Sequence, residues 1–184
     1  MPISIDALAR ALKPSATSLL IGAGASVPSG APTGMQLATD LWKRVAGATA
    51  LSADLRETAT ILQRRFSRRA VVDVVVKSLS GLRPTGGLLG LPKFGWKRIF
   101  TTNFDKLMEG AYGQQGIAFV PIRSNYDFSS KESAQGVRIF KIHGCISQDE
   151  SLGDKASMTL TDRDYETHKQ YRQLLFAKLS SSLL

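Results

Sequence analysis

Three short segments place small or polar side chains directly after apolar runs. They are GAGAS at 22–26, TTNFD at 101–105 and KIHG at 141–144. Glycines that follow a buried strand let backbone N–H groups approach a pyrophosphate. An asparagine can contact a ribose hydroxyl or place a water molecule, and a neutral imidazole can accept a proton near physiological pH. Together these residue types predict a site for a dinucleotide.

Each segment also has a purely structural interpretation. Pro28 and Ser29 interrupt the full G-x-G-x-x-G fingerprint, so the first segment is also compatible with a tight turn between strand and helix. Asn103 and Asp105 suit a helix cap, and a single histidine such as His143 is often structural. Together the three segments favour a ligand site more than any one of them does, because side chains from all three can reach one cleft.

The surrounding pattern predicts the elements that position them. Short apolar or β-branched runs predict strands at 18–21, 97–101, 117–122 and 137–142. Helical spacing predicts helices at 35–45, 53–66, 104–113 and 161–179, with a short amphipathic helix before Pro14. Residues 68–81 suit a strand or a helix, and the Asp73 and Lys77 spacing favours helix. Residues 83–95, rich in glycine and proline, predict a loop.

Strands alternate with helices, which predicts an α/β, Rossmann-like fold with a mostly parallel sheet and helices on both faces. The three segments follow the first, second and fourth predicted strands. Since the carboxyl ends of parallel strands share one edge of the sheet, we expect their side chains to converge there.

Composition limits the classes of protein that fit. The chain of 184 residues, with 43% hydrophobic and 21% charged residues, is typical of one globular domain. Its formal charge of +9 favours anionic partners such as nucleotides. A single cysteine, Cys145, excludes an internal disulfide and a multi-cysteine zinc site, and it favours the cytoplasm. The sequence contains neither a secretory signal nor an apolar run of about 20 residues, so no membrane association is expected.

The basic run LQRRFSRRA, at 62–70, places four arginines on adjacent helical turns. Such a run can contact nucleic acid or an acidic partner, but a solvated helix face explains it more simply. Any nucleic-acid contact is therefore expected only through a partner. His168, beside Glu166 and Lys169, is predicted to be a solvated surface residue.

The order and separation of GAGAS, TTNFD and KIHG resemble those of the sirtuin-like domains, specifically the bacterial NAD hydrolase branch associated with antiphage defence. The resemblance covers residue 18 to the C-terminus, and it implies cleavage of the nicotinamide–ribose bond of NAD. It implies catalytic roles for Asn103 and His143, with the asparagine holding the ribose or a water molecule. The NAD-binding residues that it implies are Gly22, Ala23, Gly24, Ser26, Thr33, Thr102 and Asp105.

The chain departs from the protein-deacylating sirtuins in two ways. It lacks their four-cysteine zinc module, so no metal is expected, and VPSGAPTG lacks their Asp-Phe-Arg run. These departures favour NAD hydrolysis, with a non-catalytic NAD or ADP-ribose sensor as the alternative and a deacylase as a less favoured one. A dehydrogenase is remote, because the glycine fingerprint is incomplete.

The resemblance also carries expectations about the whole protein. An enzyme that consumes NAD needs control, so a homo-oligomer, an associated domain or a regulatory protein is expected. Family members continue past the helix of Tyr165 to a Gly-Tyr-Ser strand, which this sequence lacks. Residues 1–184 are therefore expected to form a single NAD-binding domain that is an incomplete part of a larger protein.

Overall fold

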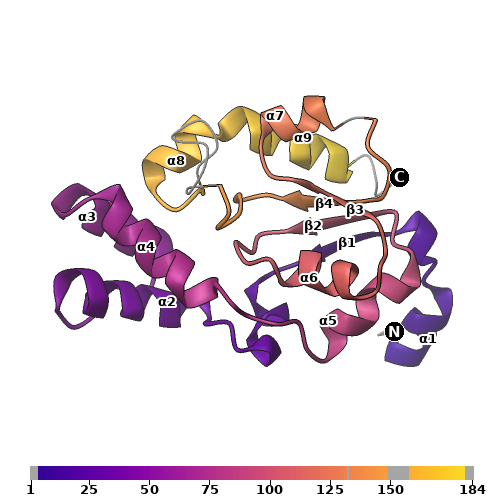
Figure 1. The fold of residues 1–184 in the computed structure, drawn as a ribbon, viewed down its shortest axis with the longest axis horizontal. Helices are drawn as coiled ribbons and strands as arrows, with labels where there is room; N and C mark the ends of the chain where they lie inside the picture. The colour runs from indigo at the N-terminus through magenta and orange to yellow at the C-terminus, as the bar shows by residue number, and fades with distance from the viewer. Residues whose placement is uncertain (1–3, 132, 149–157, 181–184) are drawn as a thin grey trace.

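Four parallel strands form the centre of the molecule (Figure 1). The computed structural model describes residues 4–131, 133–148 and 158–180. The strands are β1 (Ser18–Ile21), β2 (Arg98–Thr101), β3 (Phe119–Ile122) and β4 (Val137–Lys141). Their order in the sheet is β1-β2-β4-β3, and every neighbouring pair is parallel. This all-parallel sheet with its helices confirms the predicted α/β fold class.

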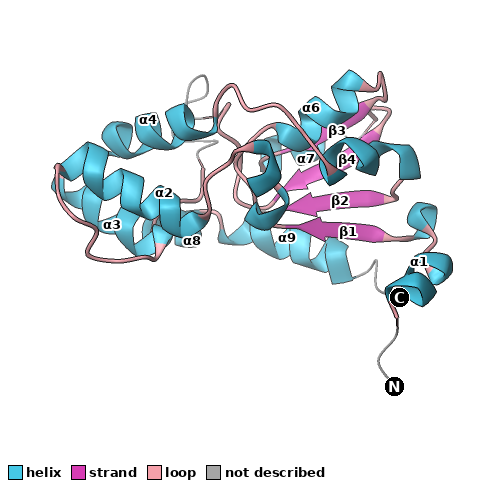
Figure 2. Cartoon of the chain, turned by 90° about the horizontal axis from the view of Figure 1, so that it is seen from below, coloured by secondary structure: helices cyan, strands magenta, loops and turns pink. Residues whose placement is uncertain are grey.

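Helices cover both faces of the sheet (Figure 2). Ile99 and Ile139 are paired in register and belong to the same buried cluster as residues of α6 (Leu107–Gln114). Their neighbours Phe100 and Phe140 point to the opposite face, where their rings stack at 4.7 Å. That face packs against α9 (Lys169–Ser180). The period-2 alternation of the strands therefore divides the core into two layers.

A group of helices lies beyond the carboxyl ends of the strands (Figure 2). It contains α2 (Gly34–Leu41), which continues as a π-helical turn, α3 (Leu55–Arg65) and α4 (Arg68–Leu79). Side-chain oxygens cap all three helices, those of Thr33, Asp54 and Ser67. The valine-rich run is helical because its buried side chains recur at helical spacing, while Asp73 and Lys77 face solvent.

The remaining helices differ in part from the predicted pattern. The predicted amphipathic helix before Pro14 is α1 (Ile5–Ala11), and the predicted loop at 83–95 contains the short α5 (Gly87–Gly90) and a 3₁₀ turn. A short helix that was not predicted, α7 (Asn125–Ser130), follows β3. The predicted C-terminal helix is two helices, α8 (Asp162–Thr167) and α9, separated at His168. Among the described residues, no helix is long and apolar enough to cross a membrane.

Candidate functional site

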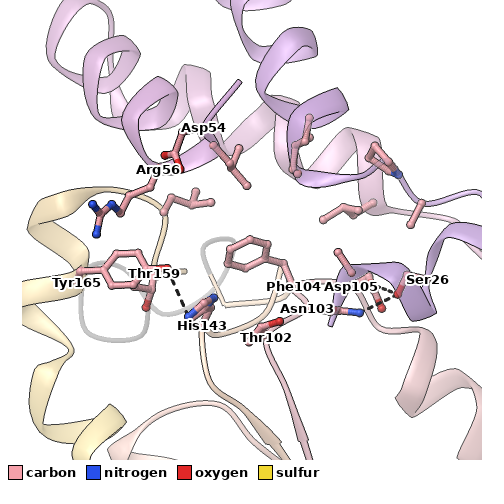
Figure 3. A pocket seen from close by; sticks show the side chains of 18 residues that line it. Ser26, Asp54, Arg56, Thr102, Asn103, Phe104, Asp105, His143, Thr159 and Tyr165 are labelled. Carbon is pink, nitrogen blue, oxygen red and sulfur yellow. Dashed lines mark hydrogen bonds between the residues drawn. The ribbon is translucent and has the colours of Figure 1, made fainter. Parts of the chain in front are cut away.

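A cavity of about 320 Å³ lies where the carboxyl ends of the strands face the helical group (Figure 3). Its volume is within the usual range for small-molecule sites. The segments after β1, β2 and β4 all contribute to its wall, as the sequence predicted. Six of the nine predicted site residues line it, namely Ala23, Ser26, Thr102, Asn103, Asp105 and His143, whereas Gly22, Gly24 and Thr33 are outside the lining. Helices α3 and α8 close the opposite side with Arg56 and Tyr165.

Asn103 is held by hydrogen bonds that fix the direction of its amide. Its Nδ2 donates to Ser26 Oγ at 2.9 Å and to the Gly22 carbonyl at 3.1 Å. Ser26 Oγ in turn donates to Asp105 Oδ2 at 2.7 Å, as Figure 3 shows. Because both bonds use Nδ2, the orientation leaves Oδ1 as the acceptor. That oxygen is buried and has no hydrogen-bond partner among the described residues.

Asp105 has a double role at the start of α6. Its Oδ1 accepts a hydrogen bond from the backbone N–H of Leu107 at 2.9 Å, and its Oδ2 accepts from Ser26. The carboxylate therefore accepts from the first N–H of α6, although the N-cap position predicted for it belongs to Lys106, which has no side-chain cap, and it also holds the serine that contacts the asparagine. Helix α6 begins at Leu107, three residues later than the start predicted at Phe104.

The fold itself does not require the glycines of the loop after β1. Neither Gly22 nor Gly24 has a positive φ. A Cβ at Gly24 would meet nothing within 4 Å, and one at Gly22 would only touch Thr102 Oγ1 at 3.6 Å. The chain's own packing thus leaves room for side chains, and a close approach by a ligand would give these glycines a purpose.

Thr33 lies at the N-terminus of α2, where its side chain caps the helix. Its Oγ1 accepts from the Gln36 backbone, while Gln36 Oε1 accepts from the Thr33 N–H, which completes a capping box for α2. The residues on either side of it, Pro32 and Gly34, line the cavity, whereas Thr33 is outside the lining.

His143 follows β4 and lines the cavity on the same side as Thr102 and Asn103, which follow the neighbouring strand β2 (Figure 3). Burial, aided by the positive charge of Arg172, lowers its pKa from 6.5 to about 4. The imidazole is therefore neutral at physiological pH and can accept a proton. Its Nε2 lies 3.4 Å from the hydroxyl of Tyr165. The other histidine, His168, was predicted to be a solvated surface residue, but its Nδ1 lies 2.9 Å from Thr159 Oγ1.

Two residues that support the site, Lys141 and Tyr165, have roles that were not predicted from the sequence. Lys141, inside the KIHG segment, is almost fully buried, and its ammonium contacts both the backbone carbonyl of Asp105 and the carboxylate of Glu109, the latter at 3.2 Å. This ion pair ties β4 to α6 beneath the asparagine loop. Tyr165 was named only as part of a helix, since nothing in its local spacing indicates that α8 turns it toward His143.

Metal ions are bound in proteins by sets of ligand side chains that lie close together. Within residues 4–131, 133–148 and 158–180, no three His, Cys, Asp or Glu side chains come close enough together to hold a metal ion. The polar groups that face the cavity are instead suited to hydroxyl and amide groups of an organic ligand.

Comparison with known families gives one match. A family model described as a SIR2-like domain matches residues 97–184, just under half of the chain. The matched part includes β2, Asn103, β4 and His143, while the glycine loop after β1 precedes it. No curated protein matches the chain.

Proposed function

We propose that this chain is an NAD-consuming hydrolase that cleaves the nicotinamide–ribose bond to give nicotinamide and ADP-ribose. SIR2-like domains use NAD, and the matched residues 97–184 include Asn103 and His143. The observation that carries the proposal is the buried Asn103 Oδ1, which lacks a partner among the described residues and shares a cavity with a neutral His143. An oriented acceptor beside a proton acceptor is what this hydrolysis needs.

Each group has a role in this proposal that follows from its bonds. The Ser26 and Gly22 contacts engage Nδ2 and leave the Asn103 carbonyl oxygen to accept from a ribose hydroxyl or from the attacking water. His143 accepts the proton that such a hydroxyl or water gives up. Loss of nicotinamide develops oxocarbenium character on the ribose, and oriented polar groups favour that transition state.

The binding assignments are also part of the proposal. Gly22, Ala23 and Gly24 would offer backbone N–H groups to the pyrophosphate, and the room that the two glycines leave fits a close approach. Ser26, Thr102 and Asp105 would lie beside the nicotinamide ribose. Thr33 would contribute by fixing the end of the loop between β1 and α2, because its own side chain caps α2.

We further propose that residues 1–184 act as one NAD-binding domain whose activity is controlled by self-assembly or by a regulatory partner. Uncontrolled loss of NAD would harm the host cell, which is consistent with a role in bacterial antiphage defence. The one cysteine, a buried free thiol, is compatible with the reducing cytoplasm.

The direct test is nicotinamide release from NAD without any peptide. We expect the parent protein to release nicotinamide, and Asn103→Ala and His143→Ala each to lower kcat by about 10²-fold or more. Asn125→Ala, at an exposed position on α7, is the matched control and should retain the parent rate. Circular dichroism and thermal unfolding check that each variant is folded.

Three results would contradict the proposal. If NAD binds, as measured by calorimetry, but nicotinamide is not released, the chain is an NAD or ADP-ribose sensor. Equal rates in the parent and in both folded variants would remove Asn103 and His143 from the chemistry. Release that requires an acyl-lysine peptide would instead indicate a deacylase.

A further inference from the structure

Tyr165 is placed to act on His143 from the far wall of the cavity (Figure 3). Its hydroxyl lies 3.4 Å from His143 Nε2, and the two rings meet edge to face at a centroid distance of 5.4 Å. The sequence places these residues 22 positions apart, on α8 and on the loop after β4. Both the polar and the ring contact therefore join the two side chains.

Two arginines hold the Tyr165 ring in this place. The guanidinium of Arg172, from α9, lies 4.5 Å from the ring centroid, and that of Arg56, from α3, lies 5.3 Å away. Arg172 also donates to the backbone carbonyl of Tyr165. Cation–π contacts of this kind stabilise an aromatic ring in one position. The phenol is thus fixed by three helices rather than free to rotate away.

The protonation states of the two side chains leave two possible directions for this hydrogen bond. Burial raises the pKa of Tyr165, although the charges of Arg172 and Arg56 partly oppose this, so the phenol keeps its proton at pH 7. His143 is neutral at the same pH. A neutral imidazole bears its proton on one nitrogen only, and the hydrogen bond that the ring makes selects which one.

We propose that Tyr165 is a positioning residue for His143: its hydroxyl donates to Nε2 and so fixes the imidazole with the proton on Nδ1. Nε2 then bears the lone pair, which accepts the Tyr165 hydrogen bond and can accept a proton when a ligand takes the place of that hydroxyl. This role rests on the proposed hydrolase function, but the tautomer itself does not. Arg56 and Arg172 act indirectly, by holding the tyrosine ring.

The test compares Tyr165→Phe, which removes only the hydroxyl, with Tyr126→Phe, the same change at an exposed tyrosine on α7. Two-dimensional ¹H–¹⁵N spectra of the imidazoles identify the protonated nitrogen. A His168→Gln background leaves His143 as the only histidine, since the chain has two. In the parent we expect the Nδ1–H form, and in Tyr165→Phe a mixture of both forms. Tyr126→Phe should leave the spectrum unchanged.

Kinetics give the second readout. We expect Tyr165→Phe to lower kcat for nicotinamide release about tenfold, with KM changed by less than about twofold. An Nε2–H form in the parent overturns the proposal even if the variant does not fold, and so does an unchanged tautomer in a folded Tyr165→Phe. If the parent releases no nicotinamide, the hydrolase fails, yet the spectra still decide the role of Tyr165.

Discussion

Because His143 is buried, the free energy of unfolding depends on pH. The unfolded chain titrates this imidazole near 6.5, whereas in the folded protein its pKa is about 4. Between these values the unfolded state binds a proton that the folded state excludes. The stability that the neutral imidazole supports is therefore complete above pH 6.5, and it is lost as the pH falls toward 4.

This difference predicts how stability changes with pH. From pH 7.5 to pH 5, His143 should cost the parent about 2 kcal/mol of unfolding free energy, and His143→Gln should be spared that loss. Urea unfolding of both proteins at the two pH values measures it. Subtracting the loss in His143→Gln from the loss in the parent cancels the contributions of the other titrating groups. Equal losses in the two proteins would show that the imidazole is not held neutral.

The residues of the site were predictable to different degrees. Asn103, Asp105 and His143 could be found because each follows a predicted strand, and the carboxyl ends of parallel strands share one edge. Tyr165 and Lys141 could not be assigned roles, because these depend on how α8 packs and on a buried ammonium that contacts the Asp105 carbonyl. Such contacts leave no local spacing signal.

Among the elements, prediction was most accurate where one local signal dominated. The four strands were predicted at the observed places because short apolar runs are bounded by turn residues. The predicted helix at 161–179 instead breaks at His168, where the backbone leaves helical geometry. α7 was missed because it is only six residues long. It begins with a Ser124 cap and is held by Asp127, which pairs with Arg123 and Lys131.

The junction before β4 depends on a glycine. Gly136 has φ of 126°, and a Cβ there would lie 2.8 Å from backbone atoms of Ala118 and Phe119, at the start of β3. Gly136→Ala should therefore destabilise the protein by about 2 kcal/mol or more, because the two strands must shift apart. Urea unfolding monitored by circular dichroism measures this change.

Gly113 supplies the matched control for that substitution. It lies in α6, and a Cβ at this position would meet nothing within 4 Å. Gly113→Ala should leave stability unchanged or raise it by up to about 1 kcal/mol, since alanine favours helix more than glycine does. A Gly136→Ala protein as stable as Gly113→Ala would contradict the close strand approach.

At the scale of the whole molecule, the basic run at 62–70 serves partly to join its layers. Arg68 forms two 3.0 Å contacts with the carboxylate of Asp164 and donates to the Met158 carbonyl, so it connects α4 to α8. Arg69 pairs with Asp73 on its own helix. Arg68 therefore departs from the predicted solvated face because it is part-buried, whereas Arg69 is exposed as predicted.

The Arg68–Asp164 pair is a part-buried link between the helical group and the segment that carries Tyr165. Burial alone would raise the pKa of Asp164, but hydrogen bonds from the Thr161 backbone and from Arg68 lower it, so the carboxylate is charged. Asp164→Asn keeps the shape of the side chain but leaves the Arg68 guanidinium without its counter-charge. We expect the free energy of unfolding at pH 7 to fall by about 2–4 kcal/mol.

An exposed ion pair within α4, between Arg69 and Asp73, provides the comparison. Asp73→Asn breaks the Arg69 contact, in which both side chains are largely exposed, and it should cost less than about 0.5 kcal/mol. Urea unfolding at pH 7 measures both variants. If they lose equal stability, the link between α4 and α8 is no stronger than a surface ion pair. A large loss for Asp164→Asn alone means that one buried ion pair helps to hold the two walls of the cavity together.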